Sequence, residues 1–146
     1  KIIIWAHNGH IGKNYGFDYE NANIEKYMMG DFLFKQTSIS NELYIAGFTS
    51  FAGNVSWAND PKNSGIIAKP AKKSFENWIA QNYSLAFVDF LPYNKQHAGK
   101  AEAFSMKGSI VNSGQHHTSY VHYWTKIFDG VFFIRNMYGC KPATLQ

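Results

Sequence analysis

Apolar and polar blocks alternate along the chain, and their lengths and periods predict alternating strands and helices. The chain opens on a largely apolar, β-branched run, Lys1–Ala6. Such a run suits a strand covered on both faces, as in a parallel sheet, better than a half-exposed strand. Turn-forming polar residues then fill 7–23, which predicts a long loop directly after that strand. Long ordered loops in compact domains are often functional, so this loop is the first place to expect an active site.

Farther along, apolar spacing predicts two helices, each followed by a strand. Apolar residues recur every three to four positions across 23–37, as in an amphipathic helix, and 42–51 has the composition of the next strand. The same order returns with a helix at 72–82, capped by Ser74, and a strand at 85–90. This alternation of helix and strand predicts an α/β fold.

Three further segments complete the pattern. The turn-rich stretch 59–64 indicates an insertion or a β-hairpin, and 92–114 fits either short strands or an ordered loop. Residues 131–134 form a closing strand. Together the segments predict a mostly parallel sheet flanked by helices. Because the chain starts inside an apolar run, we expect this sheet to be incomplete at its N-terminal side, and residues 1–146 to be the C-terminal portion of one domain, with no second domain.

Composition and charge exclude several classes of protein. The formal net charge is +4, but the basic residues are scattered, and only Lys69, Lys72 and Lys73 approach a cluster, which indicates solvated surface and no nucleic-acid partner. Cys140 is the only cysteine, so an internal disulfide and a zinc site built on several thiolates are excluded. No apolar run approaches the roughly 18 residues of a membrane span. We expect a soluble protein with no membrane partner, and of the compartments, which the sequence leaves open, the cytoplasm is slightly favoured.

Aromatic residues are unusually frequent, at 17% of the chain. Most should lie in the core, because aromatic side chains bury large areas. A minority could line a pocket for a bulky, partly polar ligand such as a glycan or a macrocycle. Composition alone does not choose between these uses.

The predicted loop carries His7 and His10 where the opening strand ends. In an open α/β sheet, ligands bind beyond the carboxyl ends of the strands. Two imidazoles there could transfer protons near neutral pH, donate to an oxyanion or bind a metal, and Asn8 could orient either ring. The alternative is structural: His7 would cap the strand end, and His10 would be an exposed loop residue.

Other candidate groups carry weaker signals. His116, His117 and His122 lie within seven residues, but without a carboxylate or a helical spacing they indicate polar surface or a pocket rim better than a metal site. None of the serines considered as nucleophiles lies in a G-x-S-x-G elbow, and Cys140 has no paired histidine motif. The serines are Ser105, Ser113 and Ser119.

Four segments resemble, in order, those of the erythromycin esterase-like family. The most specific is Trp5–Ile11, which resembles the family signature W-A-H-N-x-H-[IV]. The others are Met29-Gly30 with Leu33, Ile45 through Gly53, and Phe128–Ile134. The resemblance spans nearly the whole chain. It implies an α/β fold with a parallel sheet flanked by helices, and hydrolysis of an ester or lactone without a metal or other cofactor.

The resemblance also assigns residues and shows a gap. His7 and His10 match the two active-site histidines of the signature, and Asn8 between them is a candidate substrate-binding residue. The family places its proposed general base in a G-E-x-x-H-G motif near the start of the domain, and no such motif exists here. We therefore expect two partners, a small-molecule ester, lactone or acylated sugar and the remaining N-terminal part of the same domain. The fragment alone should be inactive.

A carbohydrate-binding module is the alternative from another class of function. Its aromatic residues, Trp57 and Trp78 among them, would stack on sugar rings without chemistry. Such a module should be an antiparallel sandwich with a row of exposed aromatics. The helical periods at 23–37 and 72–82 favour an α/β fold instead.

Overall fold

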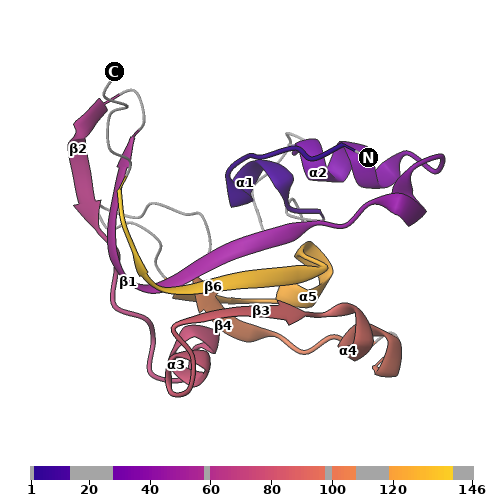
Figure 1. Ribbon diagram of the computed structural model, residues 1–146. Helices are drawn as coiled ribbons and strands as arrows, with labels where there is room; N and C mark the ends of the chain where they lie inside the picture. Colours follow the sequence, from indigo (N-terminus) through magenta and orange to yellow (C-terminus); the bar gives the residue numbers. More distant parts are fainter. Residues whose placement is uncertain (1, 14–27, 58–59, 98–99, 108–118, 140–146) are drawn as a thin grey trace, which may run out of the picture. The chain divides into compact units, whose positions relative to one another are not determined.

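The computed structural model describes residues 2–13, 28–57, 60–97, 100–107 and 119–139 (Figure 1). Its α-helices are α1 Asn8–Ile11, α2 Met29–Lys35, α3 Phe75–Ala80, α4 Leu91–Gln96 and α5 Trp124–Ile127, with a 3-10 turn at Ser40–Glu42. Its strands are β1 Ala46–Trp57, β2 Asp60–Ile66, β3 Leu85–Asp89, β4 Phe104–Lys107, β5 Ser119–His122 and β6 Gly130–Met137. Within these ranges, none of the helices is both long enough and apolar enough to cross a membrane.

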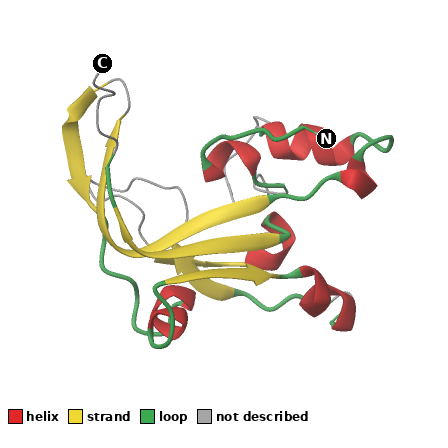
Figure 2. Ribbon diagram, viewed as in Figure 1, coloured by secondary structure: helices red, strands yellow, loops and turns green. Residues whose placement is uncertain are grey.

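The strands form a four-stranded sheet in the order β2-β1-β6-β3 and a two-stranded sheet of β4 and β5 (Figure 2). The expected mostly parallel sheet is wrong, because the sheet is mixed. β1 and β6 run parallel: Ile45 O accepts from Gly130 N, and Phe48 stacks on Phe132 farther along both strands. β3 runs antiparallel to β6, since Phe90 N donates to Asp129 O at one end of the pair and Arg135 N donates to Ser84 O at the other. An apolar run indicates a buried strand but carries no information on its direction.

Residues 60–64 belong to β2, which pairs with β1 as in a β-hairpin, one of the two forms that the sequence allows, and residue 59 lies outside the described ranges. β1 and β2 pair antiparallel, with Val55 opposite Gly65. β1 itself is longer than predicted and bends past Gly53, whose φ is +119°. A Cβ there would lie 2.0 Å from the Met137 carbonyl oxygen, so only glycine lets the two backbones approach this closely.

The opening segment is not the buried strand that its composition predicts. Residues 2–7 belong to no strand, and Ile3 is 91% exposed. A strand forms only where a neighbour satisfies its backbone groups, and none of the described strands pairs with this segment. The opening segment is therefore apolar in composition but exposed in the structure.

Several other predicted elements are confirmed. α2 coincides with the second half of the helix expected at 23–37, and residues 14–27 lie outside the described ranges. α3 lies inside the expected 72–82 helix, and its cap is Ser74, whose Oγ accepts from Asn77 N at 3.4 Å. β3 and β6 match the two strands expected late in the chain. The segment left open, 92–114, contributes one short strand, β4, and nearly all of α4, a helix that was not predicted, while 98–99 and 108–114 lie outside the described ranges.

Contacts divide the chain into two compact units, which are described separately. The first comprises 1–48, 87–103 and 123–132, and the second 49–86, 104–122 and 133–146. The core of the first unit is Ile45, Phe90, Trp124, Ile127, Phe128 and Val131. The core of the second is Ile67, Phe75, Ile79, Ala80, Met106 and Phe133. All the residues of the histidine motif lie in the first unit.

Candidate active site

The histidine motif forms a single helical turn, α1, at the start of the loop predicted over 7–23, of which residues 14–23 lie outside the described ranges. His7 is the N-cap of α1, and its carbonyl oxygen accepts from His10 N at 2.8 Å and from Ile11 N at 3.3 Å. The turn closes where Gly12 N donates to Asn8 O at 3.0 Å. The two histidines are thus placed by a short helix and not by the end of a strand.

The structure brings the rings of His7 and His10 together. Their centroids lie 6.0 Å apart with the planes at 63°, and both residues are exposed. His7 Nδ1 accepts from Gly9 N at 3.3 Å. A backbone N–H can only donate, so Nδ1 is unprotonated, and the neutral His7 ring carries its proton on Nε2. The fold therefore selects the tautomer of His7.

The pKa of His7 is lowered from its ordinary value. Removal of part of the ring from water is the larger cause, and repulsion by His10 is the second. Both effects favour the uncharged imidazole near neutral pH. His7 is thereby prepared to donate its Nε2–H as a neutral group.

Asn8 fixes the turn to β1. Its Nδ2 donates to Phe48 O at 2.6 Å, and its Oδ1 accepts from Phe48 N at 2.9 Å. The side chain is buried, and both of its polar groups are used in this way. In this structure Asn8 positions the histidines, and its direct contact with a substrate stays a prediction.

A buried ion pair holds the other end of the turn. Lys13 Nζ pairs with Asp129 Oδ1, and Lys13 N donates to Ile127 O at 3.1 Å. The second carboxylate oxygen of Asp129 accepts from Ile45 N at 2.8 Å. Charged groups are buried only when paired and hydrogen-bonded, and Asp129 meets both conditions. Sequence reasoning missed this pair, although Asp129 lies in one of the family-like segments.

Gly30 allows α2 to lie against the histidine turn. A Cβ at this position would lie 1.7 Å from Ile11 O and 2.8 Å from Gly12 O. No side chain fits in that space, so the approach of the two helices requires glycine. The M-G pair noted in the sequence therefore has a packing explanation.

Tyr44 joins two carboxylate-bearing residues at the same end of the unit. Its hydroxyl donates to Asp89 Oδ1 at 2.9 Å and lies 3.2 Å from Asp129 O. Burial, followed by the hydrogen bond and charge of Asp89, raises the pKa of Tyr44. Tyr44 is thus held protonated and links β3 to the residue that binds Lys13.

The other histidine and serine candidates do not join the pair. His122 is buried in β5 of the second unit, so of the two expected placements polar surface is wrong for it, and a pocket rim stays a prediction. Its ring packs edge-on against Tyr120, with centroids 6.1 Å apart. Ser119 Oγ accepts from Ala71 N at 3.2 Å. Ser105 lies in β4 of the same unit.

Four of the candidate residues lie outside the ranges that the structure describes. These are His116, His117, Ser113 and Cys140. Among the residues that are described, no group of three or more histidine, cysteine, aspartate or glutamate side chains is arranged to hold a metal ion.

The second unit contains a buried polar cluster that sequence reasoning missed. Glu76 is fully buried, and its Oε1 accepts from Thr49 Oγ1 at 2.5 Å and from Lys107 N at 2.7 Å. Lys107 Nζ donates to Phe51 O at 2.9 Å. Burial lowers the pKa of Lys107 to about 8, against the opposing attraction of Glu76. Glu76 is 27 positions from Thr49 and 31 positions from Lys107 in the sequence, so no local pattern signals this cluster.

Comparison with known proteins gives one family and two related folds. A family model described as erythromycin esterase matches residues 1–137, whereas no curated protein matches. A solved succinoglycan biosynthesis protein is 19% identical, with a TM-score of 0.61, over 92% of this chain and 32% of that one. A solved Bacillus cereus protein is 18% identical, with a TM-score of 0.62, over 92% and 33%. Such low identity shows the fold alone, and the chain spans about one third of the length of either neighbour.

Proposed function

Because the chain belongs to the erythromycin esterase family, we propose that it is the C-terminal portion of a hydrolase domain that cleaves an ester or lactone bond in a bulky substrate. The observation that carries the proposal is the histidine pair. Two imidazoles lie 6.0 Å apart on one anchored turn, and the protonation site of one of them is set by the backbone.

The pair supplies two of the three functions that such a hydrolysis needs. Attack of water on the carbonyl carbon places negative charge on the carbonyl oxygen, and preorganised N–H donors stabilise that oxyanion. Neutral His7 suits this role because its Nε2 carries the proton. His10 suits protonation of the alkoxide that leaves when the tetrahedral intermediate collapses.

The third function, removal of a proton from the attacking water, is assigned to another part of the domain. Members of the family carry the proposed base in a G-E-x-x-H-G motif that this chain lacks. We assign the base to the remaining N-terminal part, which then completes the site. This reaction uses acid–base chemistry and hydrogen bonds and requires no metal or cofactor.

The substrate class is a small-molecule ester, a lactone or an acylated sugar. One of the solved neighbours is described as a succinoglycan biosynthesis protein, which supports including acylated saccharides among the compounds to test. The family name alone does not fix erythromycin as the substrate.

The test compares the polypeptide encoded by the whole gene with the 146-residue chain on a panel of esters, macrolactones and acylated saccharides. We expect His7→Ala and His10→Ala each to lower the rate of the whole polypeptide by about a hundredfold or more. His97→Ala is the matched control, because His97 is exposed in the same unit and stacks on Tyr93. Ordinary enzymatic rates from the 146-residue chain, unchanged by both substitutions, would show the proposal to be wrong.

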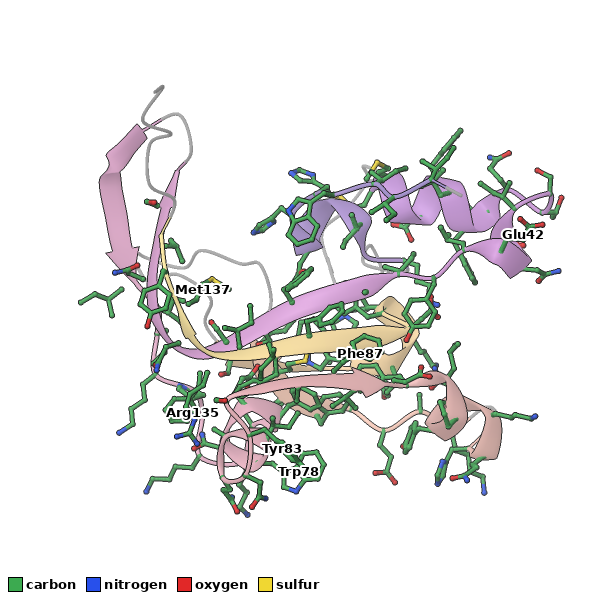
Figure 3. The ribbon with its side chains drawn as sticks, in the orientation of Figure 1. Glu42, Trp78, Tyr83, Phe87, Arg135 and Met137 are labelled. Atoms are coloured by element: carbon green, nitrogen blue, oxygen red, sulfur yellow. The ribbon has the colours of Figure 1, made fainter. Side chains whose placement is uncertain are left out.

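The alternative, a carbohydrate-binding module, is not favoured. It requires Trp78 on an exposed sheet face, whereas Trp78 lies on helix α3 (Figure 3). The side chain of Trp57 lies outside the description. A mixed sheet with helices also differs from the antiparallel sandwich that this alternative predicts.

A further inference from the structure

Five aromatic side chains form a continuous row in the unit that carries the histidine pair. The members come from the opening segment, β1, β6, β3 and the residues before β1. We call this set the aromatic row. Its ring centroids lie 5.0 Å apart for Trp5 and Phe48, 5.2 Å for Phe48 and Phe132, 4.6 Å for Phe132 and Phe87, and 6.3 Å for Phe87 and Tyr44.

The aromatic row lies on the face of the sheet opposite the core. Phe132 is exposed, whereas its neighbours Val131 and Phe133 are fully buried on the other face. Phe87 is exposed on β3 (Figure 3), and Trp5 is 80% exposed at the end of the row. Contiguous exposed apolar surface of this kind marks a site of interaction.

The geometry of the rings favours a polypeptide over a sugar as the occupant. Phe48 and Phe132 stack on each other with their planes at 19°, so their faces are used within the aromatic row. A sugar or planar ligand that stacks needs a free ring face, whereas ring edges form an apolar ridge on which a helix packs.

The length of the related folds indicates where that polypeptide comes from. The match includes 92% of this chain but only 32% and 33% of the two solved neighbours, so most of each neighbour lies outside the matched part. We propose that the aromatic row is the docking surface for an apolar helix face of the remaining part of this domain. The inference rests on the proposed function in taking that part of the hydrolase as the partner.

Docking on the aromatic row would place the partner beside the histidine pair. Trp5, at one end of the row, is two residues before His7. Asn8 binds both backbone polar groups of Phe48, the next member of the row. The helix that covers the row therefore lies next to the histidine turn. The surface that joins the two parts of the domain and the site that they complete are contiguous.

Hydroxyl-radical footprinting with mass spectrometry tests the proposal, because it reads the accessibility of single aromatic side chains. The polypeptide encoded by the whole gene is compared with the 146-residue chain. We expect oxidation of Phe87, Phe132 and Tyr44 to fall several-fold in the longer polypeptide. Buried Trp124 should stay protected in both, which shows that the shorter chain is folded.

Two tyrosines give an internal control that does not depend on the shorter chain. Tyr44, in the aromatic row, is 43% exposed, and Tyr83, outside it, is 57% exposed. Within the longer polypeptide, Tyr44 should react several-fold more slowly than Tyr83. Phe87→Asp should lower the melting temperature of the longer polypeptide, whereas Tyr83→Asp should leave it unchanged.

The outcomes separate this proposal from the proposed function. Protection of the aromatic row from oxidation without hydrolysis of any ester supports docking and contradicts the proposed function. Hydrolysis without protection of the row supports the proposed function and contradicts docking. Equal oxidation of the row in both polypeptides, or a gene with no related coding sequence before Lys1, overturns the docking proposal. If the aromatic row of the shorter chain becomes protected only as the protein concentration rises, the occupant is a second copy of this chain. That result also overturns the docking proposal.

Discussion

The side-chain amide of Asn8 binds both backbone polar groups of Phe48, donating to the carbonyl oxygen at 2.6 Å and accepting from the N–H at 2.9 Å. A carboxylate has no donor and alanine has neither group, so only an amide satisfies both partners. The histidine turn is therefore positioned by a residue that belongs to the same motif.

Asn8→Ala should destabilise the protein by about 1–3 kcal/mol for each backbone group that loses its partner. Asn8→Asp should also destabilise it, because a carboxylate oxygen then faces the Phe48 carbonyl. Chemical denaturation measures both effects. Asn82→Ala, at an exposed position after α3, is the control and should change little. Wild-type midpoints for both Asn8 variants would refute the structural role of this amide.

His10→Gln should raise the pKa of His7. The substitution removes the repulsion that disfavours protonation of His7, while partial burial still holds its pKa below the ordinary value. An NMR titration of the imidazole resonances measures the shift. His97→Gln serves as the control and should leave the His7 titration in place. An unchanged His7 pKa in the His10 variant would contradict the coupling of the two rings.

Lys107 should make the protein more stable as the pH rises from about 8 toward 10.5, the folded and ordinary lysine pKa values. In that range the unfolded chain binds more protons than the folded one, so raising the pH favours folding. The raised pKa of Tyr44 changes stability with pH in the opposite direction. Tyr44 is present in both proteins when wild type is compared with Lys107→Met, so its effect cancels. The difference in their free energies of unfolding should therefore grow from pH 8 to 10 in favour of wild type, and parallel curves would contradict the prediction.

Gly30→Ala should lower stability, although alanine in an exposed helix normally stabilises by about 1 kcal/mol relative to glycine. The new Cβ would overlap the Ile11 carbonyl oxygen, so α2 or the histidine turn must move. Thermal denaturation measures the loss, and the chemical shifts of His7 and His10 report the displacement. Gln36→Ala, at the exposed end of the same helix, is the control. A Gly30 variant as stable as wild type would show that the two helices separate at no cost.

Local signals in the sequence predicted local structure well. Ser74 before an apolar helical repeat predicted a cap and its helix, and the residues from 85 predicted a strand. In each case the interactions that form the element lie within a few positions of each other. The W-A-H-N-x-H segment predicted two histidines of one site; their rings lie 6.0 Å apart, and their membership of an active site stays a prediction.

Features that depend on distant partners were not predictable in the same way. The apolar run at Ile2–Trp5 indicated a buried strand, but a strand also needs a neighbour, and composition does not show whether one is present. The direction of β3 depends on its pairing with a strand more than forty residues later. The pairing of Lys13 with Asp129 joins two residues that have no common local pattern.

The separation of Lys13 from its partners has a consequence for synthesis on the ribosome. The histidine turn emerges first, but Asp129 is made 116 residues later. At translation rates of roughly 5–20 residues per second, that interval lasts on the order of ten seconds. During this time the turn has no anchor at its C-terminal end. The two histidines are thus translated long before their turn is fully fixed, and a nascent chain released before residue 129 would carry both without the anchor at the C-terminal end of the turn.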